Sequence, residues 1–506
     1  MSSQMLIIFA LGLPLAIAAG IAIAGKIPNL REGVTIAGAT TLFAVVLTLV
    51  LRVADGARPE LMLWEAIGGL SFAFKLEPLG ALFACVASGL WIVNSFYSIG
   101  YMRGNRERNQ TRFYICFAIA IFGAMGVAMS ANLFTLFVFY EVLTLSTYPL
   151  VAHKGDAAAE RGGRIYLMTL LGTSLGFFLP AVVATSVVTG GSLDFVPGGL
   201  LAGAPNATPL VCSVLLILFA FGIGKAALMP FHFWLPNAMV APTPVSALLH
   251  AVAVVKAGVF TVLKVSIYIF GEDLLAATPS REFILAVACF TIVVASLIAM
   301  TKDNLKARLA YSTIAQLSYC TAGAMLANPD GFMGGAMQIA AHASGKITLF
   351  MCAGAIYVAT GINNISEMRG LGKRMPLVFI AFFVASLSII GVPPLAGGWP
   401  KFELMQGATA SGFDYVSFVL IASSLLNVAY LLPIPILALM PPPGTPEPAP
   451  YKRPGGAPAF TVAAPVFTAA LCVILFFAIG PVYDFLAPAV QAPADLAAGL
   501  IPGSDG

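Results

Sequence analysis

The sequence predicts an all-α membrane protein with fourteen transmembrane helices, because it is very apolar, weakly charged and divided into long apolar runs. Of its 506 residues, 59% are hydrophobic and only 9% are charged, whereas soluble domains carry about 25% charged residues. The mean hydropathy is +0.94. Apolar runs of bilayer-spanning length are helical, since a helix satisfies its own backbone groups in lipid.

We expect the helices at 5–24, 33–51, 79–101, 113–130, 132–151, 165–189, 209–229, 244–270, 283–301, 309–326, 332–359, 376–392, 415–440 and 460–486. The first run has no basic residues before it, which indicates a retained helix and not a cleaved signal peptide. The seventh and twelfth helices meet prolines, at Pro230 and at Pro393 and Pro394. Because proline removes a backbone hydrogen bond, we expect both helices to be broken and to continue as short half-helices.

Two stretches of the chain echo one another. FGIGKAALMPFHFWLP at 221–236 and IIGVPPLAGGWPKFEL at 389–404 each combine a proline break with one lysine. LLHAVAVVK at 248–256 is similarly echoed by AAHASGK at 340–346. Helices seven and twelve are an odd number of helices apart, so the second copy would enter the membrane from the opposite side. This is the inverted-repeat pattern of secondary transporters, in which broken helices form the transport site.

The basic residues predict the orientation of the helices. Seventeen of the 26 Lys and Arg residues lie in loops that follow odd-numbered helices, and four lie in loops that follow even-numbered helices. The positive-inside rule then places the odd loops in the cytoplasm and both termini outside. We therefore expect a multi-pass protein of a bacterial-type inner (cytoplasmic) membrane. Residues 441–459, rich in Pro and Gly, are typical of a cytoplasmic linker without regular structure.

The remaining five basic residues are all lysines, and all lie at membrane depth: Lys225, Lys256, Lys264, Lys346 and Lys401. Glu141, Glu403, His250 and His342 lie at similar depth. A charge at the bilayer centre costs about 2.5–3.5 kcal/mol, so these residues predict a hydrated path through the core. Burial disfavours the charged form of lysine, which lets it exchange a proton, whereas arginine stays charged.

Particular roles follow from these positions. Lys225 lies deep in the seventh helix, and Glu141 is its expected ion-pair partner, so that forming or breaking the pair would hold or release the proton on Lys225. His342 and Lys346 are four residues apart on one helical face, which suits a relay. Lys264 and Glu403 fit either a path-tuning role or side chains that reach toward the membrane surface.

Other classes of chemistry are disfavoured. The seven cysteines all lie in apolar segments and form no CxxC pair, which argues against iron–sulfur or zinc sites and against a disulfide framework. We find no nucleotide-binding glycine motif and no HExxH motif. We therefore expect no cofactor, no metal and no nucleic-acid partner.

Four motifs resemble a known family of membrane subunits. They are GKAALMPFHFWLPNAMVAPTPVSALLHAVAVVKAGVF, LKARLAYSTIAQLSY, HASGKITLF and GVPPLAGGWPK. They are similar to the antiporter-like subunits of respiratory complex I, membrane-bound hydrogenases and Mrp-type sodium/proton antiporters, over residues 77–430. Within this family, the stretch APTPVSALLHAVAVVKAGVF is most similar to the MrpD subunits of the Mrp type.

The resemblance implies two inverted five-helix repeats, helices 4–8 and 9–13. The implied division is 1–112 for helices 1–3, 113–270 for the first repeat, 271–440 for the second, and 441–506 for a linker, helix 14 and a tail. The family's glutamate on helix 5 falls on Glu141 and its lysine on helix 7 falls on Lys225. Its bridging residues on helix 8 fall on Lys256 and His250. The helix 11 pair falls on His342 and Lys346, and the exit lysine of helix 12 falls on Lys401.

The function implied is that of a proton-translocating subunit of a sodium or potassium/proton antiporter, working in lipid beside homologous and small accessory membrane subunits. One alternative is a non-redox, proton-pumping subunit of an NADH:quinone oxidoreductase or of a membrane-bound hydrogenase. A second is a proton-coupled module for inorganic-carbon uptake. A third is a non-transporting scaffold, which the five buried lysines disfavour.

Overall fold

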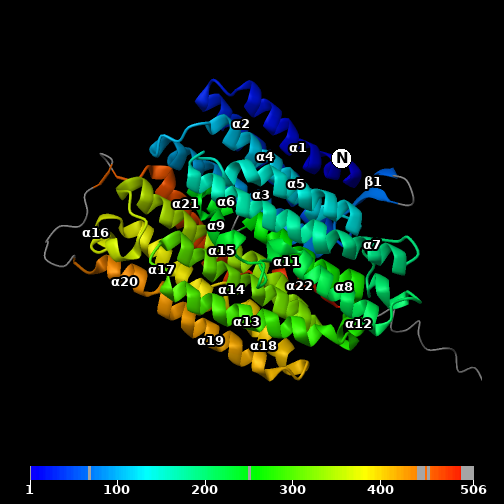
Figure 1. Ribbon diagram of the computed structural model, residues 1–506. Helices are drawn as coiled ribbons and strands as arrows, with labels where there is room; N and C mark the ends of the chain where they lie inside the picture. Colours follow the sequence, from blue (N-terminus) through cyan, green and yellow to red (C-terminus); the bar gives the residue numbers. More distant parts are fainter. Residues whose placement is uncertain (1, 66–69, 249–251, 442–450, 453–455, 492–506) are drawn as a thin grey trace, which may run out of the picture.

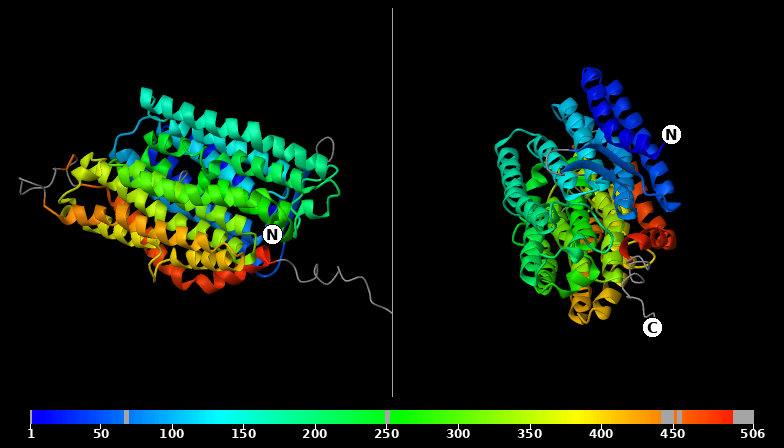
Figure 2. Two further views of the ribbon diagram at one scale, coloured as in Figure 1. Left: turned by 60° about the horizontal axis from the view of Figure 1, so that its bottom comes forward. Right: turned by 90° about the vertical axis from the view of Figure 1, so that its right-hand side faces the viewer.

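The computed structural model describes residues 2–65, 70–248, 252–441, 451–452 and 456–491. The helices run side by side along one direction, from left to right in Figure 1, and are seen nearly end-on in the right panel of Figure 2. The N-terminus, the strand β1 and the short helix α12 lie at one end, and α16 and α20 lie at the other. The two ends correspond to the two predicted sides of the membrane.

The chain begins with helices and one hairpin. The first half contains α1 Ser3–Ile23, α2 Pro28–Ala54, β1 Glu60–Glu65, β2 Ser71–Lys75, α3 Pro78–Gly104, α4 Gln110–Met129, α5 Leu133–Val151, α6 Ala157–Thr173, α7 Leu179–Val188, α8 Pro209–Gly222, α9 Trp234–Asn237, α10 Thr243–Leu248, α11 Val254–Val265 and α12 Glu272–Ala277. The second half contains α13 Ser280–Thr301, α14 Leu305–Leu326, α15 Pro329–Thr360, α16 Leu371–Arg374, α17 Pro376–Ile390, α18 Gly398–Ala410, α19 Asp414–Leu431, α20 Pro433–Leu439, α21 Ala459–Phe477 and α22 Ile479–Val490.

Among the described residues, ten helical segments are long and apolar enough to cross a membrane. They include Ala157–Val188, in which a π-helical turn at Ser174–Phe178 joins α6 to α7. The apolar helices Pro209–Gly222, Pro376–Ile390 and Ile479–Val490 are shorter. The protein is therefore a helical multi-pass membrane protein, and the count of fourteen spans stays a prediction.

The expectation of an all-α chain was wrong at the second loop. Glu60–Glu65 and Ser71–Lys75 pair as an antiparallel hairpin, with Glu60 opposite Lys75. The aromatic and polar alternation of SFAFK fits the pleat of a strand. The hairpin lies at the end of the helices (Figure 1), where we expect its backbone groups to be outside the hydrocarbon region.

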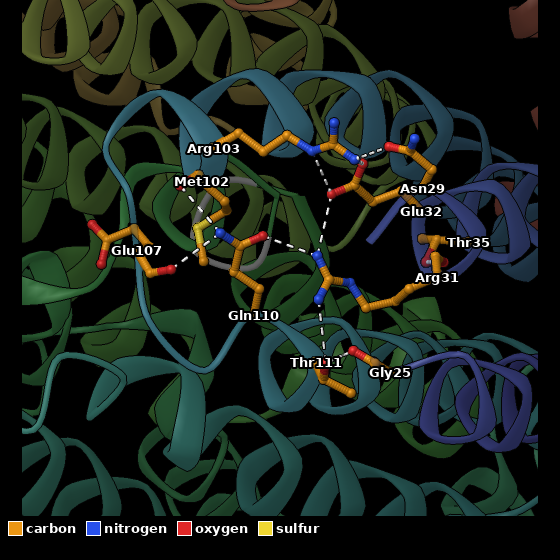
Figure 3. Close-up of polar contacts among 10 residues, drawn as sticks. All are labelled: Gly25, Asn29, Arg31, Glu32, Thr35, Met102, Arg103, Glu107, Gln110 and Thr111. Carbon is orange, nitrogen blue, oxygen red and sulfur yellow. Dashed lines mark hydrogen bonds and ion pairs between the residues drawn. The ribbon is translucent and has the colours of Figure 1, made fainter. Parts of the chain in front are cut away.

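A polar network around the buried residues Arg31 and Glu32 connects the N-terminal helices (Figure 3). Glu32 on α2 forms ion pairs with Arg31 and with Arg103 on α3, and Arg103 Nε donates to Glu32 Oε1 at 3.0 Å. Arg31 also donates to Gln110 at 2.9 Å and to Thr111 at 3.2 Å, both on α4. Buried charges are tolerated when they are paired and hydrogen-bonded. The network therefore ties α2, α3 and α4 together at the end opposite β1.

The core is organised around α15. The most apolar stretch of α15 that is long enough to cross a membrane is entirely buried. This holds for no other candidate span among the described residues. It packs against α3, α14, α17, α18 and α21. A helix that is buried on all sides has no surface on which a polar side chain could reach lipid headgroups. Polar residues on α15 must therefore be satisfied inside the protein.

Both expected helix breaks are present. The helix α8 ends at Gly222, and a 3-10 turn, Gly224–Ala226, follows before α9 begins at Trp234. Lys225 therefore lies in the break and not deep within the helix. The helix α17 ends at Ile390, and α18 begins at Gly398 with Lys401 in its first turn.

Replacing Glu32 with alanine should destabilise the protein strongly. It leaves Arg31 buried without a carboxylate, and removing one partner of a buried ion pair costs about 3–5 kcal/mol. The matched control is Glu60→Ala, which removes the exposed pair with Lys75 at 2.6 Å and should cost less than about 1 kcal/mol. Thermal unfolding of the purified variants in detergent measures the difference, and equal shifts would contradict this account.

Candidate functional site

Lys225 is held in the first break by α5. Its Nζ donates to the backbone oxygen of Tyr140 at 2.8 Å and to Thr144 Oγ1 at 2.6 Å, and it lies 3.1 Å from the centroid of the Tyr140 ring. Its backbone N–H donates to the Tyr140 hydroxyl at 3.0 Å. The residue is completely buried. Two oxygens and an aromatic face therefore stand in for water around this nitrogen.

Glu141 follows Tyr140 on α5 and is half-buried. Within the described part of the chain, no ion pair within 4 Å joins it to Lys225, and both carboxylate oxygens are buried without a hydrogen-bond partner. The structure thus shows Lys225 bonded to neutral oxygens and Glu141 beside it, with the expected pair unformed.

The helix α11 lies directly against the break. A Cβ atom on Gly258 would overlap the backbone of Lys225 and Ala226. Only glycine permits this close approach. It brings Lys256, two residues earlier on α11, into the same region of the core as Lys225.

Lys256 and His342 form a direct contact between α11 and α15. Lys256 Nζ lies 2.6 Å from His342 Nδ1, and both residues are buried. One of the two nitrogens must donate and the other accept, so the pair shares a proton. His250, the other residue expected on this helix, lies outside the described residues.

Among the described residues, no hydrogen bond joins His342 to Lys346, the two residues that the sequence placed on one face of a helix as a possible relay. Lys346 Nζ instead points to α14 and donates to Ser312 Oγ at 2.5 Å. The Tyr430 hydroxyl donates to the same Ser312 oxygen at 2.8 Å and also contacts Asn427. Lys346 is thus connected through Ser312 to a polar group on α19.

The second helix break provides hydrogen-bond acceptors for Lys401. Its Nζ donates to the backbone oxygens of Ile389 at 3.1 Å and Ile390 at 2.5 Å, the last residues of α17. It also donates to Ser424 Oγ on α19 at 2.7 Å. The last carbonyls of a helix have no partner within the helix and carry partial negative charge. The break therefore supplies two acceptors for this ammonium group.

The helix α19 carries polar residues that sequence reasoning missed. Ser423, Ser424, Asn427 and Tyr430 are spaced at i, i+1, i+4 and i+7, which places them along one side of the helix. They extend from Ser312 beside Lys346 to Lys401. Their helical spacing within an apolar run was a visible signal, but it did not reveal which lysines they would meet.

Lys264 also has a partner that was not expected. Its Nζ lies 2.6 Å from Glu77 Oε1 at the start of α3 and donates to the Ser130 backbone oxygen at 2.7 Å. Lys264 is completely buried and Glu77 nearly so. Lys264 therefore does not extend toward the lipid surface.

Several buried polar atoms near these lysines have no hydrogen-bond partner among the described residues. They are both Glu141 carboxylate oxygens, His342 Nε2, Gln316 Nε2 and Asn427 Nδ2. Buried polar groups in native proteins bond to protein or to ordered water. These atoms lie along the row of lysines and are groups that ordered water could bond.

Comparison with known proteins identifies the family of the chain. Residues 130–427 match the family described as NADH:quinone oxidoreductase/Mrp antiporter, TM. The chain is 32% identical over 354 residues to the N subunit of the NADH-quinone oxidoreductase of Desulforudis audaxviator (strain MP104C), covering 68% of this chain and 70% of that protein. It is 33% identical over 337 residues to the A/B subunit of a probable K(+)/H(+) antiporter of Rhizobium meliloti (strain 1021), covering 66% of this chain but only 33% of that protein.

Solved structures share the fold. A chain of the Mrp complex from Dietzia sp. DQ12-45-1b superposes with a TM-score of 0.80 at 22% identity, covering 95% of this chain and 97% of that chain. A chain of the membrane-bound sulfane sulfur reductase, an archaeal respiratory complex, superposes with a TM-score of 0.84 at 22% identity, covering 99% and 100%. The family match, together with a core of buried lysines, confirms the resemblance: this chain belongs to the antiporter-like membrane subunits shared by NADH:quinone oxidoreductases and Mrp antiporters.

Proposed function

We propose that this chain is the proton-translocating subunit of a multisubunit sodium or potassium/proton antiporter. The observation that carries the proposal is the burial of four lysines. Lys225, Lys256 and Lys346 are 0% exposed, and Lys401 is 6% exposed. Intramembrane ionisable groups that face the protein interior mark ion and proton pathways. Each of these nitrogens has oxygen or nitrogen partners at hydrogen-bond distance, so a proton can leave or arrive without exposure to lipid.

The contacts suggest an order for proton movement. Lys225 would receive a proton from one side beside Glu141, whose carboxylate favours the charged lysine when it is ionised. Lys256 and His342 would pass the proton across α11 and α15, since Nδ1 of the ring faces Lys256 and Nε2 faces away from it. Lys346, Ser312 and the polar side of α19 then lead to Lys401. Water would bridge the gaps beside the unpartnered atoms of Gln316 and Asn427.

A redox-driven complex is the second candidate. The match to the N subunit of a quinone oxidoreductase over 70% of its length favours it. The cation antiporter is supported by the K(+)/H(+) antiporter relative, whereas the superpositions on chains of an Mrp complex and of a respiratory complex show only the shared fold. Both candidates need the same intramembrane lysines, so the partners distinguish them.

The proposed setting is the cytoplasmic membrane of a bacterial-type cell. The solved structures that share the fold are multisubunit membrane complexes. We therefore expect this chain to assemble with homologous and small accessory membrane subunits in lipid. Both termini would lie outside. The start of α1 lies at the end of the helices that carries β1 and α12 in Figure 1, and residues 492–506 lie outside the described part of the chain.

Purification of the native complex should identify the function directly. The proposal predicts that only hydrophobic membrane subunits copurify, and that an imposed sodium or potassium gradient drives proton movement in proteoliposomes. A pH-sensitive dye inside the vesicles measures it. Copurifying iron–sulfur proteins with quinone-linked proton pumping would instead establish the redox-driven candidate.

Lys225→Ala should abolish proton movement while membrane insertion stays normal. The substitution removes the group that holds the proton in the first break, and loss of a positioned acid–base group lowers rates by about 100-fold or more. Lys26→Ala is the matched control because Lys26 is exposed in the first loop. Proton flux in proteoliposomes, divided by the amount of assembled complex, gives the readout. Flux at the level of the control would count against the proposal.

Lys256 and His342 should behave as one unit. Because the proton passes between their two nitrogens, Lys256→Ala and His342→Ala should each reduce proton flux by a similar factor, and the double variant should lose little more than either single variant. The measurement is a double-mutant cycle on proton flux. Losses that multiply would show that the two residues act independently.

A further inference from the structure

Ser312, Tyr430 and Asn427 form a chain of hydrogen bonds that begins at Lys346. Lys346 Nζ donates to Ser312 Oγ at 2.5 Å, and Ser312 Oγ lies 2.8 Å from the Tyr430 hydroxyl. The same hydroxyl contacts Asn427 Oδ1. All four residues are buried. The chain runs from α15 through α14 to α19, so it joins three helices of the core.

The charge of Lys346 determines the direction of the hydrogens in this chain. A charged lysine can only donate, and each hydroxyl group has one hydrogen to give. Among the described residues, Ser312 has no hydrogen-bond partner besides Lys346 and Tyr430. When Lys346 is charged and donates to Ser312, the Ser312 hydrogen must therefore point to Tyr430. The Tyr430 hydrogen then points to the Asn427 oxygen, which can only accept.

Loss of the proton from Lys346 permits the opposite direction. A neutral amine has a lone pair, so Ser312 can donate to Lys346 Nζ, and Tyr430 can donate to Ser312 Oγ. The Asn427 oxygen then loses its donor, and its Nδ2 already lacks a partner among the described residues. A buried amide without hydrogen bonds is unfavourable. Asn427 therefore favours the direction that belongs to the charged lysine.

The surroundings of the chain make these neutral oxygens important for the charge of Lys346. Within the described part of the protein, Lys346 forms no ion pair within 4 Å. The groups that face Lys346 or Tyr430 from the same or neighbouring helices are cationic or uncharged, and they are Lys256, His342, Arg308, Tyr319 and Ser296. Since none of these groups is a carboxylate, hydrogen-bond acceptors have to stabilise the ammonium group.

The far end of the chain lies close to the acceptor of a second lysine. Asn427 follows Ser424 by three residues on α19, which places both on one side of the helix. Ser424 Oγ accepts a hydrogen bond from Lys401 at 2.7 Å. The helix α19 thus places the end of the chain from Lys346 one turn away from the acceptor of Lys401.

We propose that Ser312, Tyr430 and Asn427 act as a hydrogen-bond switch that responds to the charge of Lys346, with Asn427 as its positioning residue. The inference rests on the proposed function, in which Lys346 gains and loses a proton. When Lys346 gives its proton to water, one N–H bond breaks, one O–H bond forms on the water, and the two hydroxyl groups rotate. When a proton returns, Tyr430 turns back to Asn427, and the charged lysine is stabilised again.

Two substitutions of Asn427 should move the pH dependence of proton flux in opposite directions. Asn427→Asp ends the chain with a carboxylate, which keeps Lys346 charged to higher pH, so the alkaline limb of the pH profile should move up by about half a unit or more. Asn427→Leu removes the acceptor and should move this limb to lower pH. Asn109→Asp adds the same charge at an exposed residue before α4 and should leave the limb unchanged.

Proton flux is measured in proteoliposomes of the assembled complex at a series of pH values, equal on both sides, under an imposed sodium or potassium gradient. Each profile is scaled to its own maximum, so a difference in the yield of complex does not move the limb. A residue that only supports packing would lower the flux without shifting the two Asn427 profiles in opposite directions.

Tyr430→Phe separates an effect through the chain from a direct effect of charge. It keeps the ring but removes the hydroxyl, so in this background Asn427→Asp should shift the limb by less than half as much. An undiminished shift, or Asn427→Asp and Asn427→Leu profiles that superimpose, would overturn the switch while leaving the proposed function intact. Absence of proton movement by the unsubstituted complex would overturn the proposed function and the switch together.

Discussion

An ammonium group buried in a membrane protein needs hydrogen-bond partners that replace water. In this structure, that requirement determines how several of the helices pack against one another. Lys225, Lys256 and Lys346 are completely buried, and each has a different substitute. Lys225 uses a backbone oxygen, a threonine hydroxyl and an aromatic ring. Lys256 uses a histidine, and Lys346 uses a serine. Each partner lies on another helix, so solvating the lysines also specifies how the helices pack.

The two helix breaks meet this requirement in different ways. In the second break, Lys401 uses the free carbonyls at the end of α17, as expected for a lysine beside a broken helix. In the first break, Lys225 itself lies in the non-helical turn, and its acceptors come from α5. The two breaks therefore each combine proline with one lysine, but the two lysines are not solvated in the same way.

The sequence predicted the membrane class, the mostly helical chain, both breaks and the family, because these depend on local composition and short motifs. It did not predict the hairpin at 60–75 or the end of α8 at Gly222. Both depend on tertiary contacts of the backbone and not on local composition. The partners were the least predictable part. Lys256 and His342 are 86 residues apart, and Lys264 and Ser130 are 134 apart. Spacing along one helix suggested His342 with Lys346, whereas packing between helices selected other partners.

The central claim is that water connects the buried lysines into one path across the membrane. A cryo-EM map of the native complex in lipid, at a resolution that shows ordered water, tests it most directly. The account predicts water density beside Glu141, Gln316 and Asn427. This water should form a continuous hydrogen-bonded chain between the four lysines, Lys225, Lys256, Lys346 and Lys401. Side chains packed tightly against one another in those gaps, with no water between the lysines, would contradict it.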